Sequence, residues 1–398
     1  MKILHQLGHN YKWALDSYFE NKIGDGFIIG AYSIEKDKIG EKLSGYKPED
    51  YLPVSLIDLQ FYASKASSGD KLKTYDFHPI NHAKSQATEV STVEAALAGV
   101  RFQESLGLTK IIIPNIYIST DKEKQNTNLL KAINNKIKTH KKQKKNNSSY
   151  FLTIPISGSF IREDEEVERL LQKLTDMEIG FDGYYVACEP NLEARKKMSV
   201  DFKYYSNLHK IISTLKKQGF EIILGFANID SLVFAALNNI DYVSVGTYEN
   251  LRNFNIKRFT MESTGGKSDG WYYSEKIMNF ISANRLEIFY DRDAIEIIRN
   301  ENNIFSDVIL RQGYPWNTHR PDVHKNYLLA ISRQLKKISE GKNREERIAI
   351  LESMIESARK NYKEIERKGI IVDDESSNYH LPLWLTILKT PSSSIVLK

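Results

Sequence analysis

Three carboxylates are the first candidates for chemistry in this sequence. Asp58, Glu189 and Glu249 each come shortly after a run of apolar residues that has the length of a buried strand. Active sites of parallel α/β proteins lie where the strands end, and carboxylates there can act as acid, base or nucleophile. One hypothesis is therefore a glycoside hydrolase, with Glu189 as the acid and Glu249 as the nucleophile. Its retaining form requires carboxyl groups about 5 to 5.5 Å apart.

Amide and aromatic side chains add a second kind of candidate. Asn115 and Asn228 follow two further predicted strands, and an amide can read the edge of a nucleobase through its donor and acceptor. An amide in a loop can equally bond its own backbone. Trp271, Tyr272 and Tyr273 form an aromatic cluster that could stack on a base or fill a core.

The lysine-rich segment at residues 131–146 is the strongest local concentration of charge. It includes Lys141, Lys142, Lys144 and Lys145, and a positive field of this kind can bind phosphates in a salt-sensitive way. A solvated charged loop is the alternative. The net charge of +5 permits a nucleic-acid partner without requiring one.

Cysteine and histidine usage argues against a metal site. The sequence has one cysteine, Cys188, which excludes an intrachain disulfide and a zinc site built from cysteines of this chain. His78 and His82 have the spacing of a helical metal pair, but Pro79 between them disfavours the helix. We therefore predict no metal site, and we expect Cys188 to be a small buried residue.

The elements that must position these residues alternate between short apolar runs and amphipathic helical patterns. This alternation predicts a parallel sheet, and seven or eight such units favour a (β/α)8 barrel of the TIM type. A doubly wound sheet is the alternative, but it would normally show a glycine-rich phosphate loop after an early strand. The predicted strands are residues 27–33, 54–61, 110–117, 150–156, 183–188, 221–226 and 241–245, with an eighth at 286–290.

The chain divides into a barrel at residues 1–320 and a helical extension at residues 321–398. Three inserts interrupt the barrel pattern: a polar loop over the barrel mouth at residues 63–90, a lysine-rich insert at 120–149, and residues 253–285. We expect the extension to pack on the barrel or to form the face of a homodimer.

No apolar run approaches the roughly 18 residues of a membrane span. The first residues lack the apolar core of a signal peptide. We therefore expect a cytoplasmic protein that does not contact membranes.

Two stretches of the sequence resemble the tRNA-guanine transglycosylases. Residues 181–190 (FDGYYVACEP) are similar to the base-binding strand of that family, and residues 223–253 are similar to the segment that carries its nucleophile. Weaker similarities lie at residues 56–61, 102–115 and 317–329. Members of the family are (β/α)8 barrels that exchange a guanine in a polynucleotide for a 7-deazaguanine through a covalent glycosyl-enzyme, and they need no organic cofactor for this step.

The resemblance implies roles for individual residues. Asp58 occupies the position of the acid–base aspartate, and Asp241 and Glu189 are the carboxylates left to act as nucleophile or charge stabiliser. Arg252 lies in the segment that contacts the nucleic-acid backbone, to which the lysines of 131–146 could add. The base-binding candidates are Gln60, Asn115, Cys188, Asn228 and Ser244.

The sequence also departs from the family pattern. Ser244 aligns with the nucleophilic aspartate, and the zinc-binding cysteines are absent. Three hypotheses follow. The first is a divergent transglycosylase-like protein that exchanges or cleaves an N-glycosidic bond of tRNA or DNA. The second is an inactive barrel that binds nucleic acid, a nucleobase or a protein. The third is the glycoside hydrolase described above.

Overall fold

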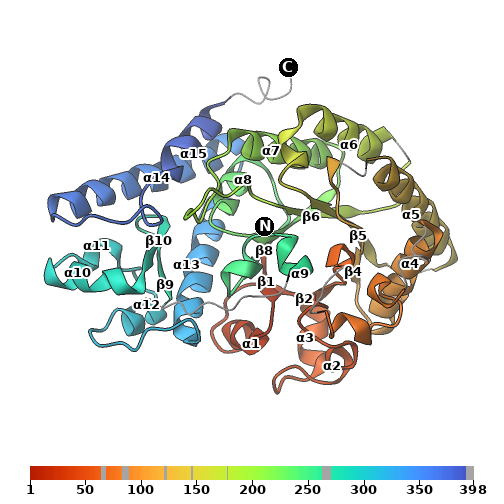
Figure 1. Cartoon of the computed structure of the whole chain (residues 1–398), viewed down its shortest axis with the longest axis horizontal. Coiled ribbons are helices and arrows are strands. Elements are labelled where there is room, and N and C mark those ends of the chain that lie inside the picture. Colours follow the sequence, from red (N-terminus) through yellow and green to blue (C-terminus); the bar gives the residue numbers. More distant parts are fainter. Residues whose placement is uncertain are drawn as a thin grey trace.

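The computed structural model of the chain is a nearly closed barrel of eight parallel strands surrounded by helices (Figure 1). The strand order is β3-β2-β1-β8-β7-β6-β5-β4, and β3 packs against β4 where the ring closes. The predicted TIM-type fold is therefore confirmed. The described residues are 1–63, 69–82, 89–120, 123–144, 147–176, 178–261 and 270–390. The barrel strands are β1 (Lys2–Leu7), β2 (Gly26–Gly30), β3 (Ser55–Asp58), β4 (Lys110–Ile113), β5 (Ser149–Ile156), β6 (Gly183–Cys188), β7 (Glu221–Ala227) and β8 (Tyr242–Gly246).

Strands that are buried on both faces read as nearly continuous apolar runs, which made seven of the eight recognisable. The prediction of the eighth was wrong, because Leu286–Asp291 forms helix α10 and the missing strand is β1. His5 and Gln6 interrupt the apolar run of β1, yet both are buried. His5 Nε2 bonds the Ile23 carbonyl at 2.7 Å, so the fold pays no large penalty for that ring nitrogen.

Helices follow the strands around the outside of the ring. The apolar residues that recur at helical spacing in residues 167–174 and 208–215 are buried on α6 and α7. The helices of the ring are α1 (Tyr11–Phe19), α2 (Lys36–Glu41), α3 (Pro48–Tyr51), α4 (Glu89–Ser105), α5 (Glu123–Gln143), α6 (Asp164–Asp176), α7 (Phe202–Lys217), α8 (Ser231–Leu237) and α13 (Pro321–Ser339).

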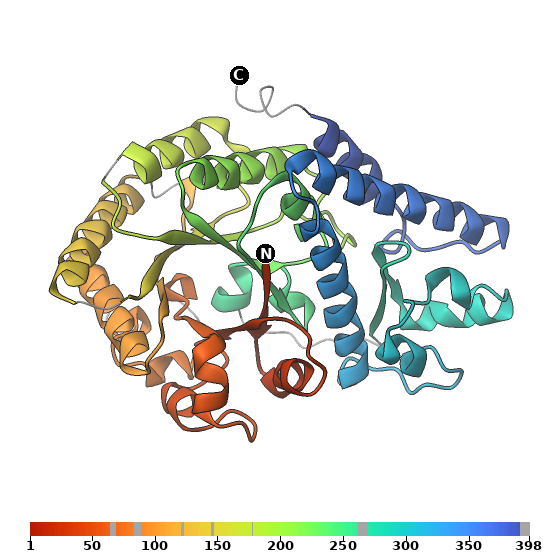
Figure 2. The ribbon, with the colours of Figure 1, turned by 180° about the vertical axis from the view of Figure 1, so that it is seen from behind.

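Residues 270–320, which precede α13, form a separate layer beside the barrel. The hairpin of β9 (Trp271–Ser274) and β10 (Asn279–Ser282) packs on α13, and Figure 2 shows α13 between this hairpin and α1. Because α13 packs against both α1 and α8, it takes the place of the last barrel helix. The boundary predicted at residue 320 thus falls where this helix begins. The short helices α10, α11 (Ile295–Ile298) and α12 (Ile304–Ile309) complete the layer, whereas α9 (Lys257–Thr260) lies at the barrel mouth, against the 3-10 helix Phe61–Ala63.

The C-terminal helices cover the outer side of α8. Helices α14 (Arg344–Arg367) and α15 (His380–Lys389) both pack on α8, which explains why every residue of that short helix is buried. Trp384 of α15 is fully buried, and its indole nitrogen donates to the Tyr205 hydroxyl at 2.8 Å. In the part of the chain that the structure describes, no helix has both the length and the apolar character of a membrane span.

Candidate functional site

Asp58, the last residue of β3, lies inside the mouth of the barrel with both carboxylate oxygens bonded. Oδ1 accepts from the Gln60 amide at 3.0 Å, and Oδ2 accepts from the hydroxyls of Tyr62 at 2.7 Å and Tyr185 at 3.1 Å. Burial raises the pKa of Asp58 to about 6, and these hydrogen bonds oppose the rise. The carboxyl group is therefore tuned by its surroundings, as at many functional sites.

A segment after β8, residues 252–260, covers this mouth. The Phe254 ring meets Tyr62 edge-on with centroids 5.0 Å apart, and Phe259 contacts the same tyrosine at 5.1 Å. Only 1% of Asp58 is exposed. A nucleobase therefore has no access to this carboxylate in the conformation seen here.

Asp241 and Ser244 lie away from Asp58. Asp241 precedes β8, and its Oδ2 accepts from Lys216 Nζ at 2.7 Å. Ser244 is buried within β8 and donates to Gln6 Oε1 at 2.7 Å. Since the strands are parallel, Asp58 at a carboxyl end and Asp241 at an amino end lie at opposite ends of the barrel. The structure does not bring together the two aspartates that the exchange mechanism needs in one pocket.

Glu189 joins three segments at the rim of the barrel. Its Oε2 accepts from the Tyr117 hydroxyl at 2.6 Å and the Gly158 amide at 3.0 Å, and its Oε1 accepts from the Ile256 amide at 2.6 Å. The carboxylate also lines an open cleft of about 680 Å³. The Tyr117 and Gly158 donors hold the carboxylate at the rim, and the Ile256 amide joins the covering segment at residues 252–260 to it.

Glu249 belongs to a different cavity. It begins the short 3-10 helix Glu249–Leu251, and its Oε2 accepts from Lys197 Nζ at 2.9 Å. Glu249 lines the cavity at the ends of β7 and β8, whereas Glu189 lines the open cleft. The two glutamates of the hydrolase hypothesis do not face a common cavity.

Three other predicted base-binding residues are bonded to backbone groups or buried. Asn115 Nδ2 donates to the Thr153 carbonyl at 3.1 Å. Gln60 Oε1 accepts from the Tyr32 amide at 2.7 Å. Cys188 is buried, and burial raises the pKa of its thiol well above the usual value, which makes it a poor nucleophile.

The predicted lysine-rich insert is in fact α5, the barrel helix that links β4 to β5. Lys141 and Lys144 pair with carboxylates of neighbouring segments, while Lys142 is exposed. Lys145 lies outside the described residues. Because most residues of α5 are polar, its apolar stripe was not recognised from the sequence. The buried residues of the stripe are Leu129, Leu130, Ile133 and Ile137.

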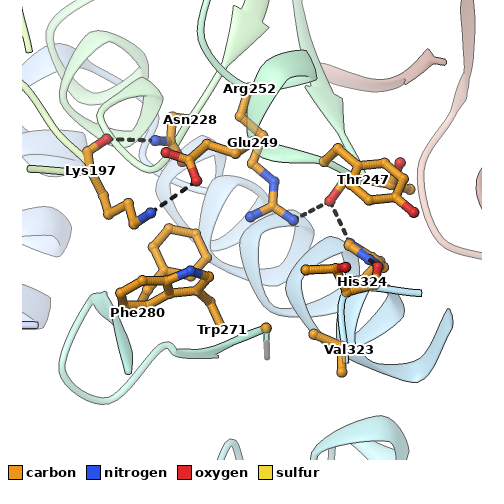
Figure 3. A pocket seen from close by; sticks show the side chains of 12 residues that line it. Lys197, Asn228, Thr247, Glu249, Arg252, Trp271, Phe280, Val323 and His324 are labelled. Carbon is orange, nitrogen blue, oxygen red and sulfur yellow. Dashed lines mark hydrogen bonds and ion pairs between the residues drawn. The ribbon is translucent and has the colours of Figure 1, made fainter. Parts of the chain in front are cut away.

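A cavity of about 150 Å³ lies where β7 and β8 end, against the β9–β10 hairpin (Figure 3). Trp271, Phe280 and Val323 provide apolar walls, and Asn228 and Arg252 bring polar groups from the loops after β7 and β8. In (β/α)8 proteins, the loops after the seventh and eighth strands frequently bind the phosphate of a ligand.

Arg252 is held in a fixed orientation by the turn after β8. A Cβ on Gly246 would lie 2.1 Å from Leu251 Cβ, so glycine permits this turn. Arg252 Nε donates to the Gly246 carbonyl at 3.0 Å, Nη2 donates to the Thr247 carbonyl, and the guanidinium carbon lies 3.5 Å from the centre of the Tyr327 ring. Only 8% of Arg252 is exposed, and burial lowers its pKa. Among the described residues, no carboxylate forms an ion pair with it.

Asn228 and His324 supply further polar groups. Asn228 is 3% exposed; its Nδ2 donates to the Lys197 carbonyl at 3.0 Å, and its buried Oδ1 accepts no hydrogen bond within the described part of the chain. The His324 ring lies between the Thr247 and Thr318 carbonyls, 2.7 and 2.8 Å from its two nitrogens. Burial lowers the pKa of His324 to about 4, and a neutral ring can donate to only one of these carbonyls.

Of the predicted residues, the cavity unites Asn228, Arg252 and Glu249, with Trp271 from the aromatic cluster. Sequence reasoning missed Lys197, which lies in an irregular stretch with no motif or period to indicate it. Tyr272 and Tyr273, also from the aromatic cluster, belong to β9 and are fully buried.

No group of three or more His, Cys, Asp or Glu side chains within the described ranges is arranged to hold a metal ion. Comparison with known proteins finds no protein-family model that matches the chain and no curated protein that matches it significantly.

Proposed function

We propose that this chain is a (β/α)8 barrel that binds a nucleobase-type planar ligand in the cavity at the ends of β7 and β8, without glycosyl transfer. The observation that carries the proposal is a pair of polar groups with unused bonding capacity between aromatic walls. Arg252 is a buried guanidinium that forms no ion pair with a described carboxylate, since Glu249 attracts it only from beyond ion-pair distance, and Asn228, which lines the same cavity, has a buried Oδ1 with no donor among the described residues. Buried polar groups are normally satisfied, so both support a ligand.

The walls of the cavity suit a flat ring. Trp271 and Phe280 offer aromatic surface on the hairpin side, on which heterocycles stack favourably, and the Lys197 ammonium already lies over the Trp271 ring, 4.1 Å from its centre. Asn228 Oδ1 can accept from a ring N–H, and Arg252 can donate to an oxygen or nitrogen acceptor of the ligand. Ligand pockets commonly combine apolar walls with a few convergent polar groups in this way.

Binding is favoured over base exchange by the positions of the predicted catalytic residues. Asp58 is covered by Phe254 and Phe259, Asp241 lies at the other end of the barrel, and Ser244 is bonded to Gln6. A covalent mechanism needs a nucleophile and an acid beside the same glycosidic bond.

The ligand is a small molecule rather than a polynucleotide. A volume of about 150 Å³ encloses one small ring system and a group attached to it, so the remainder of any larger ligand would lie outside the cavity. The lysines that suggested a phosphate-binding surface, Lys141 and Lys144, already pair with carboxylates, which weakens the field available to a polyanion.

Isothermal titration calorimetry with purine and pyrimidine bases, nucleosides and 5′-monophosphates tests the proposal, with tRNA and single-stranded DNA as further arms. We expect saturable binding of at least one small compound, and Asn228→Ala should weaken it at least about tenfold, or about 1.4 kcal/mol. Asn135→Ala, at an exposed position of α5, is the matched control and should have no effect. If no small compound binds more tightly than about 1 mM, the proposal is wrong. Binding of a polynucleotide alone would favour a nucleic-acid-binding function.

A paired assay measures release of tritiated guanine from tRNA and DNA. We expect none. Release that depends on Asp58 would restore base exchange and contradict the proposal.

A further inference from the structure

The charge of the cavity gives more information about its ligand than its shape does. Lys197 and Arg252 contribute two positive charges and Glu249 one negative charge, so the lining carries one net positive charge when His324 is neutral. Lys197 and Glu249 neutralise each other, since Lys197 Nζ lies 2.9 Å from Glu249 Oε2. The unbalanced charge therefore belongs to Arg252.

The protein partly solvates this charge without neutralising it. The carbonyls of Gly246 and Thr247 accept from Nε and Nη2, and the Tyr327 ring lies against the guanidinium. These groups are dipoles and a quadrupole, which attract a cation less strongly than a carboxylate does. The Thr247 carbonyl also lies 2.7 Å from His324 Nδ1, which donates to it in one of the two neutral tautomers. A buried cation in such surroundings is costly unless an anion joins it.

The remaining nitrogen of the guanidinium is available to a ligand. Nη1 makes no hydrogen bond among the described residues, and Figure 3 shows the guanidinium directed into the space beside Trp271 and Phe280. The bonds from Nε and Nη2 fix the plane of the group, so little conformational freedom is lost when Nη1 binds. A guanidinium preorganised in this way suits a carboxylate or phosphate oxygen.

We propose that the ligand of this cavity carries an anionic oxygen group, and that this group pairs with Arg252 while the planar ring lies against Trp271 and Phe280. This inference rests on the proposed function, because it names the chemical class of the ligand at the same site. The shared chemistry is a flat heterocycle bearing an oxyanion, and the anion comes either from a carboxylate on the ring or from a phosphate ester.

Matched ligand pairs test the inference by isothermal titration calorimetry with the full chain. Uracil and orotate share one ring and differ by a carboxylate, and uridine and uridine 5′-monophosphate differ by a phosphate. We expect one of the two anions to bind at least about tenfold more tightly than its neutral partner, or about 1.4 kcal/mol. The pair that shows the preference identifies the source of the anion.

Arg252→Met assigns the preference to this guanidinium. The variant should reduce the preference for the anion to about twofold or less, and this ratio is the readout whatever the change in the affinity of the neutral partner. Arg285→Met, at an exposed arginine outside the cavity, is the matched control and should retain it. If Arg252→Met does not fold, as judged by circular dichroism, Arg252→Lys replaces it. That variant keeps the charge and loses the planar fork, and we expect a weaker preference.

The outcomes separate the two proposals. Equal binding of an anion and its neutral partner, or a preference that persists in Arg252→Met, overturns this inference and leaves the proposed function standing. Failure of every compound to bind overturns both.

Discussion

Replacing Asp58 with Asn should make the stability of the protein less dependent on pH, in a direction that the structure fixes. Burial raises the pKa of Asp58 from 3.8 to about 6. A carboxyl group whose pKa is higher in the folded state stabilises the fold at low pH, and that contribution is lost as the pH rises through about 6. The asparagine side chain does not ionise, so the variant does not lose this stabilising contribution as the pH rises.

The size of the effect follows from the pKa difference. A rise from 3.8 to about 6 corresponds to about 3 kcal/mol. Because pH 4 is already slightly above the unfolded pKa of 3.8, part of this difference exists there, and we expect the free energy of unfolding of Asp58→Asn, relative to the wild type, to increase by about 2.5 kcal/mol between pH 4 and pH 7.5. For a chain of 398 residues this amounts to a relative rise in Tm of roughly 3 °C. Any constant cost of repositioning the Tyr62 and Tyr185 hydroxyls cancels in the comparison.

Urea denaturation followed by circular dichroism at pH 4, 5, 6 and 7.5 measures this difference. Tyr185→Phe removes one hydrogen bond to the ionised carboxylate, so its stability should fall more steeply with rising pH than that of the wild type. Burial also raises the pKa of Asp230 to about 6, so Asp230→Asn should likewise gain stability relative to the wild type as the pH rises. A stability difference between Asp58→Asn and wild type that stays constant across this range would refute the reasoning.

Three further predictions concern other buried groups. His5, whose pKa burial lowers from 6.5 to about 4, stabilises the fold fully above pH 6.5 and loses about 3 kcal/mol as the pH falls to 4, so His5→Leu should be less acid-sensitive in the same urea series. Glu189→Gln removes acceptor capacity at the rim and should increase hydrogen–deuterium exchange in residues 250–261. Gly225→Ala should destabilise the protein by about 1 to 3 kcal/mol in urea titrations, because the new Cβ would lie 2.3 Å from the Tyr185 ring.

Controls accompany the last two variants. Glu193→Gln changes an exposed glutamate and should leave the exchange of residues 250–261 unaltered. Gly40→Ala adds a methyl group within α2 at an ordinary contact distance, 3.5 Å from the nearest side-chain atom, and should be neutral or stabilising. Unchanged exchange in Glu189→Gln, or full stability of Gly225→Ala, would contradict the roles assigned here. If His5→Leu lost as much stability at acid pH as the wild type does, the effect assigned to burial of His5 would be contradicted.

The sequence by itself determined the barrel. Seven apolar runs of strand length, separated by amphipathic helical stripes, predict parallel strands covered on both faces, and each of these strands is present. The helical character of the chain after residue 321 was also predictable, because apolar residues recur there at helical spacing. These features depend on local periodicity, which one sequence contains in full.

Only the tertiary structure decided which polar residues meet. β1 was missed because His5 and Gln6 look like exposed residues until Ile23 and Ser244 bond them. Asp58 was recognised by its place after a strand, but its cover by Phe254 depends on a segment almost 200 residues away in the chain.

The cavity beside Arg252 illustrates the physical reason. Its lining comes from Asn228 after β7, Arg252 after β8, Trp271 of the hairpin and His324 of α13. The bonds available to a side chain depend on neighbours that folding brings together from these separate elements. Whether Arg252 finds a carboxylate is therefore a property of the tertiary packing, and no local pattern in the sequence records it.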